Sequence, residues 1–226
     1  MSPRIVIAID GPAGAGKSTI ARALANHFGY VNLETGAMYR SLALKALQTA
    51  TPLDNEAALA ALLGGTRIDL VPTAEGNRVM LDGHEVTERL RAGDVTAAAS
   101  RVSVYPSVRT AMVERQRAMG SQGGVVMEGR DIGTVVFPRA EAKIFLVADQ
   151  NTRASRRILQ VNATGDAARE QQLTADLKER DARDSQRATA PLRAAEDAVT
   201  LDSTHLNLEE VVAEAIRIVE QKLAAE

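Results

Sequence analysis

The 226-residue chain contains no cysteine and no tryptophan. Without cysteine it cannot form a disulfide framework, a thiolate zinc site or a thiol nucleophile. Aromatic residues make up only 3% of the chain, which argues against a base-stacking platform for single-stranded nucleic acid. Several classes of small secreted scaffold, zinc module and thiol enzyme are therefore excluded at the outset.

The chain also lacks a strong charge of either sign and any long apolar run. It has 27 Lys and Arg against 29 Asp and Glu, a formal net charge of −2, whereas nucleic-acid and anionic-membrane binders need a net basic footprint. No segment approaches the roughly 20 apolar residues of a membrane span, and the apolar run at residues 5–9 is too short for a signal peptide. We therefore expect a cytoplasmic protein with neither a nucleic acid nor a membrane as partner.

What the chain does contain is an alternation of apolar strand-like runs and helix-like periodicity, typical of a parallel sheet with right-handed crossovers. The buried-strand candidates are residues 5–9, 125–127 and 144–147, with candidate short strands at 30–33 and 199–201. The helical segments are residues 18–28, 35–48, 55–63, two helices between 94 and 124 separated by Pro106, the arginine-rich stretch 152–187 broken near Gly165, and a final helix capped by Asn207. The sequence predicts an α/β fold.

One segment departs from this alternation. Residues 67–71 and 78–81 alternate apolar and polar side chains, as half-exposed strands do, and Asp82-Gly83 is a hairpin-turn signal before Val86. An antiparallel patch inside an α/β chain predicts an inserted subdomain at about residues 66–93.

Between the first predicted strand and helix lies a phosphate-binding motif, G-x-x-x-x-G-K-[ST]. Its glycines allow consecutive N–H groups to face one anion, and the helix N-terminus adds positive dipole. Lys17 supplies a charge for the β and γ phosphates, and the Ser18 hydroxyl can ligate Mg²⁺. A flexible glycine turn is the alternative, but the full match in the required context favours a nucleotide site. Its residues are Gly11, Pro12, Ala13, Gly14, Ala15, Gly16, Lys17, Ser18 and Thr19.

The rest of the sequence narrows the class. It has no Asn-Lys-x-Asp segment for reading guanine, and no predicted strand ends in the paired acids of motor-type ATPases. Instead arginines lie at strand ends and along one helical stretch, which suits a kinase acting on a phosphorylated small molecule, because catalysis then consists of positioning and charge neutralisation. For the arginines between 153 and 187, solvated ion pairs are an equally good interpretation, whereas Arg130, in a glycine loop after a buried strand, favours function.

Four other polar positions carry weaker signals. Asp10 ends the first strand, where it can position a loop or a metal-bound water, or simply terminate the strand. His27, His84 and His205 are far apart and lack metal-ligand spacing, so surface or capping roles are expected.

Four segments, taken together, resemble the bacterial cytidylate kinase family over essentially the whole chain: residues 9–19, 35–40, 129–138 and 180–192. The resemblance implies a P-loop NTPase-type core that phosphorylates CMP and dCMP with ATP and Mg²⁺ in pyrimidine nucleotide metabolism, usually as a monomer. It also implies one domain with its core at 1–65, 94–150 and 188–226, the insert at 66–93 on the monophosphate side, and a helical lid at 151–187.

The resemblance also implies roles for individual residues. Lys17, Arg130 and Arg187 would be the catalytic set. The CMP phosphate would be held by Arg40, Arg130 and Arg187, the cytosine read by Ser100, Arg109 and Asp131, and the sugar contacted by Thr35, Arg180 and Asp184. Tyr39 would complete the substrate site, and Arg157 of the lid would face ATP. Glu34 is a departure, because the family usually has Asp there.

The base contacts make independent chemical sense. Cytosine presents an amino donor at N4 and acceptors at N3 and O2, so Asp131 suits the donor and Arg109 the acceptors. Uracil would leave polar groups unpaired, a mismatch that can cost about 10⁴ in specificity. Three alternatives stay open: a related kinase using AMP, UMP or shikimate, a non-catalytic ATP-binding switch, and an RNA-binding helix within 153–187.

Overall fold

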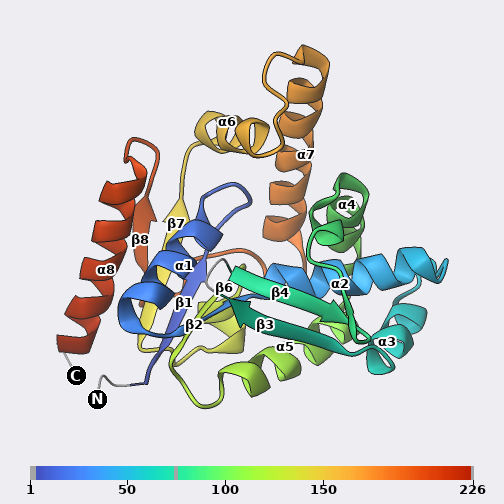
Figure 1. The fold of residues 1–226 in the computed structure, drawn as a ribbon, viewed down its shortest axis with the longest axis horizontal. Coiled ribbons are helices and arrows are strands. Elements are labelled where there is room, and N and C mark those ends of the chain that lie inside the picture. Colours follow the sequence, from blue (N-terminus) through green and yellow to red (C-terminus); the bar gives the residue numbers. More distant parts are fainter. Residues whose placement is uncertain (1–3, 74–75, 225–226) are drawn as a thin grey trace.

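The computed structural model describes residues 4–73 and 76–224. At its centre lies a five-stranded parallel sheet in the order β2-β6-β1-β7-β8 (Figure 1). The strands are β1 (Val6–Asp10), β2 (Val31–Glu34), β6 (Val125–Gly129), β7 (Ala142–Val147) and β8 (Val199–Asp202). Every residue of β1 and β6 is buried, as their continuous apolar runs predict for inner parallel strands.

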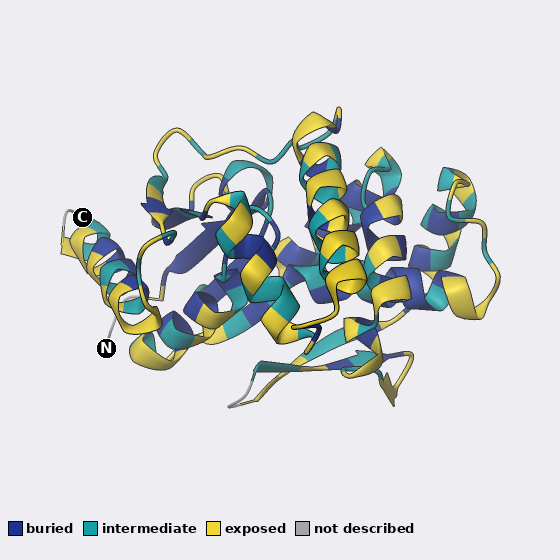
Figure 2. Cartoon of the chain, turned by 90° about the horizontal axis from the view of Figure 1, so that it is seen from above, coloured by how far each residue is buried: buried dark blue, intermediate teal, exposed yellow. Residues whose placement is uncertain are grey.

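Helices cover both faces of this sheet. Alternate residues of β1 face opposite sides, so Ile7 and Ile9 pack in one apolar cluster while Val6 and Ala8 pack in another. The first cluster includes α1 (Lys17–Phe28) and α8 (Leu208–Ala224), and the second includes α5 (Pro106–Gly120) and the short π-helix η2 (Ile132–Val136). In Figure 2 the helices turn buried faces inward and exposed faces outward.

A second, helical core lies beyond the edge strand β2. Four helices and a 3₁₀ turn form most of it around Leu42, Leu59, Val95 and Met112, all fully buried, and Ile68, Val79 and Leu81 of the inserted segment complete it. Besides α5, the helices and the turn are α2 (Thr35–Gln48), α3 (Glu56–Gly64), η1 (Arg89–Arg91) and α4 (Gly93–Val102). This cluster extends the molecule sideways from the sheet (Figure 1).

The inserted segment forms a separate antiparallel sheet, as its alternation predicts. Its strands are β3 (Ile68–Thr73), β4 (Gly76–Leu81) and β5 (His84–Glu85), paired in that order. Asp82 and Gly83 both have positive φ, +50° and +85°, which makes the tight β4–β5 turn that the Asp-Gly pair indicates. The Asn77 side chain ties this sheet to the edge of β2, accepting from the Glu34 N–H and donating to the Asn32 carbonyl.

The arginine-rich stretch forms α6 (Gln150–Gln160) and α7 (Ala167–Gln186), above the carboxyl end of the sheet in Figure 1. Asp149 and Asp166 cap their N-termini, and Gly165 at φ +87° lies in the break predicted between them. The π-helix η2 lies where the sequence indicated no element. Within residues 4–73 and 76–224, no helix is long and apolar enough to cross a membrane.

Candidate active site

The phosphate-binding loop leaves β1 at Asp10 and enters α1 at Lys17, with Gly16 as the N-cap. Gly16 has φ +99°, a conformation that side chains with a Cβ rarely adopt. At Gly11 the reason for glycine is space, because a Cβ there would lie 2.0 Å from the Leu146 carbonyl oxygen of β7. The loop therefore lies close against the sheet, and the first turn of α1 follows it directly.

Lys17 is buried and folded over its own loop, where its Nζ donates to the Pro12 carbonyl at 2.7 Å. Burial, and next the positive charge of Arg130, lower the pKa of Lys17 to about 7. An anion bound in the loop would restore a favourable environment for the ammonium group.

Glu128, near the end of β6, is an acid that faces this lysine and that the sequence did not single out. Its carboxylate accepts a hydrogen bond from the Ser18 hydroxyl, and its pKa is raised by burial and then by the negative charge of Glu34. The Thr35 hydroxyl donates to the Glu128 carbonyl at 2.7 Å. The signal was available: β6 pairs with β1 in register Ile9 to Glu128, so a single acid there faces the loop, but only paired acids were considered.

Two arginines of α6 contact the loop from above rather than facing solvent. Arg153 Nη1 donates to the Ala13 carbonyl at 3.0 Å and to Asp181 at 2.5 Å. Arg156 Nη1 donates to the Ala15 carbonyl at 3.1 Å. The root of the α6–α7 hairpin is thus hydrogen-bonded to the backbone of the phosphate loop, a role that the sequence left undecided.

Across from the loop, residues predicted to contact substrate meet around Asp184 of α7. Arg130 Nε donates to Asp184 Oδ2 at 2.8 Å, and Arg187 Nη1 lies 3.9 Å from Asp184 Oδ1. Arg187 Nε donates to the Ala190 carbonyl, while its Nη2 is buried without a hydrogen-bond partner. This buried donor lies 3.9 Å from Asp131 Oδ1, beyond hydrogen-bond distance, and is available to an anionic ligand.

Positive charge exceeds negative charge in this region. Burial, followed by the charge of Arg130, lowers the pKa of Arg180 to about 10. Burial and then Arg40 lower the pKa of Arg157. Arg40 is itself ion-paired with Glu34, the position that departs from the family pattern. Mutual repulsion among guanidinium groups drawn from α2, α6, α7 and the end of β6 favours a bound polyanion.

Two of the predicted base-reading residues contact each other directly. Arg109 of α5 forms an ion pair with Asp131, and both side chains are nearly inaccessible, 3% and 8% exposed. The Arg109 guanidinium lies over the Tyr39 ring, 5.6 Å from its centroid, and burial raises the pKa of Tyr39 to about 12. Ser100 of α4 instead accepts a 2.6 Å hydrogen bond from Arg183 of α7, a partner that the sequence did not indicate.

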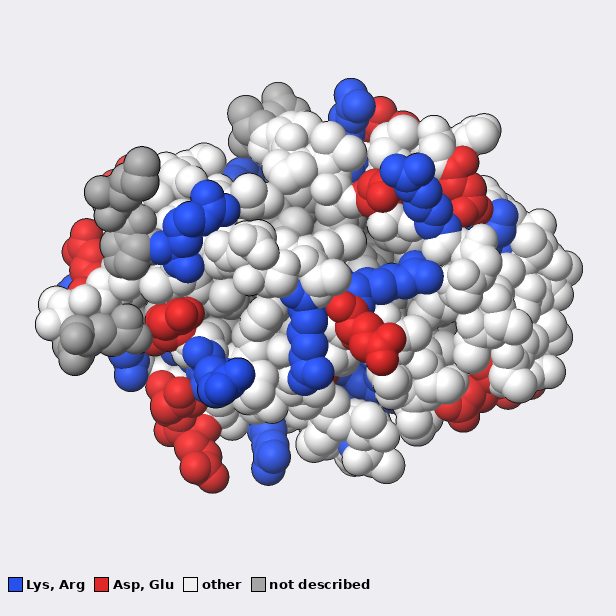
Figure 3. Space-filling view, turned by 90° about the horizontal axis from the view of Figure 1, so that it is seen from below, with Lys and Arg blue, Asp and Glu red and all other residues white. Residues whose placement is uncertain are grey.

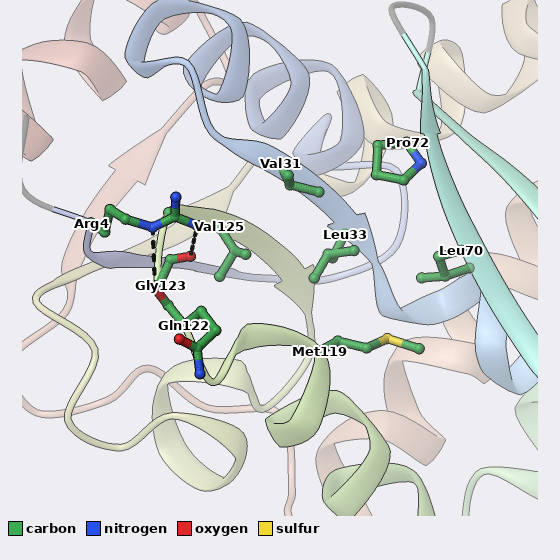
Figure 4. Close-up of a pocket in the computed structure, with 10 residues that line it drawn as sticks. Arg4, Val31, Leu33, Leu70, Pro72, Met119, Gln122, Gly123 and Val125 are labelled. Atoms are coloured by element: carbon green, nitrogen blue, oxygen red, sulfur yellow. Dashed lines mark hydrogen bonds between the residues drawn. The ribbon is translucent and has the colours of Figure 1, made fainter.

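A hollow elsewhere on the molecule does not suit a phosphorylated ligand. It has a volume of about 270 Å³ and lies between the β2 edge, β3 and the end of α5, where Val31, Leu33, Leu70 and Met119 line it (Figure 4). Its one cation, Arg4, donates to the Gln122 and Gly123 carbonyls.

On the face in Figure 3, acidic and basic side chains are interspersed rather than gathered by sign.

A phosphate loop at the end of β1, a buried lysine and an arginine cluster opposite it define a P-loop kinase for an anionic small-molecule acceptor. A family model described as cytidylate kinase matches residues 7–221. The chain belongs to the cytidylate kinase family and is a phosphotransferase.

Individual relatives agree. The chain is 49% identical to the cytidylate kinase of Geobacillus thermodenitrificans (strain NG80-2), over 99% of this chain and all of that one. It is 45% identical to the cytidylate kinase of Pasteurella multocida (strain Pm70), over 99% of this chain and 98% of that one. The crystal structure of an uncharacterized protein from Eubacterium ventriosum ATCC 27560 covers 99% of this chain and 100% of that one, with a TM-score of 0.50 at 12% identity, and shows the fold alone.

Proposed function

We propose that this protein transfers the γ-phosphoryl group of ATP to the phosphate of CMP or dCMP, giving ADP and CDP or dCDP. The observation that carries the proposal is the buried Arg109–Asp131 pair beside the arginine cluster. A carboxylate and a guanidinium side by side complement the donor at N4 and the acceptors at N3 and O2 of cytosine. To bind the base, this ion pair exchanges part of its mutual contact for contacts with the ligand.

The two phosphate groups then meet between Lys17 and the guanidinium groups. The amides of residues 11–19 and Lys17 hold the ATP phosphates, with Arg157 approaching from the lid. The guanidinium groups of Arg40, Arg130 and Arg187 hold the acceptor phosphate. Arg40 gives up its ion pair with Glu34 to bind this phosphate. Thr35, Arg180 and Asp184 surround the sugar, with Ser100 and Tyr39 at the base. No general base is required, because the acceptor oxygen is already anionic.

Mg²⁺ belongs to this proposal, and the donors present suit it. The Ser18 hydroxyl and the Glu128 carboxylate are hydrogen-bonded to each other at the loop, and both are hard oxygen ligands. Among the residues that the structure describes, no group of three or more His, Cys, Asp or Glu forms a metal cluster, in keeping with an ion that completes its shell with phosphates and water. When bound, Mg²⁺ supplies charge neutralisation on the ATP phosphates.

The domain organisation follows the same proposal. We take the chain as one domain with its core at 1–65, 94–150 and 188–226, an insert at 66–93 on the CMP side, and a lid at 151–187. Lid closure would exclude water and so suppress ATP hydrolysis. A monomer in the cytoplasm is part of the proposal, and size-exclusion chromatography with light scattering tests the monomer.

The experiment is an acceptor panel. The protein is incubated with MgATP and each of CMP, dCMP, UMP, AMP, GMP and shikimate, and ADP release is measured. Turnover with CMP and dCMP far above the others supports the proposal. Preference for another acceptor identifies a related kinase, and tight ATP binding without turnover identifies a switch. Either of those two results contradicts the proposal.

A further inference from the structure

We infer that Asp10 is a positioning residue that holds the cytosine-reading loop in place, and so sets CMP affinity and the preference for CMP over UMP. The inference deepens the proposed function and rests on it. The Asp10 carboxylate hydrogen-bonds to the backbone that directly follows Asp131, and its main effect passes through that backbone.

The hydrogen bonds of Asp10 link two loops that are distant in the sequence. Asp10 and Asp131 are 121 positions apart. Both oxygens of the buried Asp10 carboxylate accept backbone hydrogen bonds: Oδ1 from the Ile132 N–H at 2.8 Å and Oδ2 from the Gly133 N–H at 2.7 Å. These are the two residues that directly follow Asp131. The carboxylate therefore fixes the peptide groups that determine where the Asp131 side chain points.

The need for a carboxylate at this place comes from the π-helix η2. The first N–H groups of a helix have no partner within it. In η2 the Val135 and Val136 N–H groups bond to the Asp131 carbonyl, whereas in the described part of the chain those of Ile132 and Gly133 have Asp10 as their partner. A buried N–H group left unpaired is costly, so loss of either bond would shift or loosen the start of η2.

The same loop is also closely packed at Gly133. A Cβ added at Gly133 would lie 3.4 Å from Asp10 Oδ2 and 3.2 Å from Cδ of the buried Lys143. The Lys143 ammonium donates to the Pro138 carbonyl and to Asp197, so its stem is held in place. Gly133 thus lies between two immobilised side chains, and a displacement of Asp10 is passed on to Asp131 rather than absorbed.

Asp10 also directly precedes Gly11, the first residue of the phosphate loop, yet the hydrogen bonds of its carboxylate go to η2, and its electrostatic interaction with Lys17 is weaker than these bonds. This separation predicts an unequal effect on the two substrates. A change at Asp10 will disturb the CMP site more than the ATP site, whereas a general loss of stability would disturb both.

The test is Asp10→Asn. The variant keeps the shape of the side chain, but its NH₂ group replaces one of the two carboxylate oxygens and faces the N–H of Ile132 or Gly133, where no hydrogen bond can form. We expect the KM for CMP to rise about tenfold, equivalent to about 1.4 kcal/mol. The KM for ATP is expected to stay within about twofold, and the ratio of kcat/KM for CMP to that for UMP is expected to fall. Equal increases in both KM values, or an unchanged CMP-to-UMP ratio, would overturn the inference.

A second variant approaches the same contact from the loop and keeps the test decisive if the first fails to fold. Gly133→Ala presses on Asp10 and Lys143, and the same direction of change in KM for CMP is expected. Gly64→Ala, in α3, is the matched control because a Cβ there meets nothing within 4 Å. No CMP-selective effect in Gly133→Ala, or an equal effect in Gly64→Ala, would contradict the inference.

A readout without substrate separates this inference from the proposed function. Amide hydrogen exchange at Ile132 and Gly133 is expected to be slow in the parent protein and at least about tenfold faster in Asp10→Asn. If the parent protein does not use CMP, the proposed function fails and the exchange result still reports on Asp10. If the parent uses CMP and the two amides exchange equally in both proteins, the positioning role fails.

Discussion

At the scale of single residues, the site depends on charges that are buried before any ligand arrives. Lys17, Arg180 and Arg187 all have their pKa lowered chiefly by burial, with a neighbouring guanidinium acting in the same direction. From the sequence it was predictable only that arginine and lysine side chains would line the site. Their pairing was not, because it depends on distant chain segments, as in the contact of Ser100 with Arg183.

The first prediction concerns Lys17 and pH. Its pKa is lowered to about 7 in the free protein, and an adjacent phosphate favours the charged form and raises it. ATP binding near pH 7 should therefore take up about 0.5 proton, and affinity should weaken as pH rises above 7. Calorimetry in buffers of different ionisation enthalpy measures the uptake.

Lys17→Arg supplies the control, because arginine stays charged and should remove that part of the uptake. Equal proton uptake in both proteins would assign the titration to another group.

The second prediction concerns Asp131. Asp131→Asn keeps the size of the side chain but removes the carboxylate partner of Arg109 and the acceptor proposed for N4. We expect kcat/KM for CMP to fall by a factor of about 10² or more, while the Kd for ATP changes little. Steady-state kinetics and ATP titration measure the two effects, and an equal loss of both would remove Asp131 from base reading.

At the scale of elements, the inner strands, the phosphate loop and the Asp-Gly hairpin were predictable because each has a local pattern. The local order of residues accounts for these features: apolar runs predict the buried strands β1 and β6, and the Asp-Gly pair predicts the positive φ of Gly83. The π-helix η2 was not predictable. Its five residues have no periodicity of their own, and its start depends on Asp10 in another element.

The third prediction concerns the contact between α6 and the phosphate loop. Arg153→Lys keeps the charge but loses the planar fork that reaches the carbonyls of Ala13 and Ala148. We expect the KM for ATP to rise about tenfold with a smaller change for CMP, because the phosphate loop loses a constraint on its backbone. Initial-rate kinetics with each substrate varied in turn measure the difference.

Arg217→Lys is its matched control, since Arg217 is exposed on α8 and pairs only with Glu214 among the described contacts. The interpretation of Arg153 would be wrong if the two variants behaved alike.

At the scale of the whole molecule, the sequence indicated an insert but not how it joins the core. The joints are side-chain contacts between distant segments: Asn77 on the β2 edge, and Lys45 of α2 with Asp82 of the β4–β5 turn at 2.8 Å. No local pattern encodes such pairs. The same holds for the convergence of Arg40, Arg130 and Arg180, since each comes from a different element.

This arrangement leads to one central claim: two anionic nucleotides bind with their phosphates facing each other, between the phosphate loop and the guanidinium groups. A single molecule that carries adenosine and cytidine joined through a chain of phosphates should then occupy both sites at once. We predict that it inhibits competitively against ATP and also competitively against CMP. Competition with only one of the two nucleotides would contradict the account.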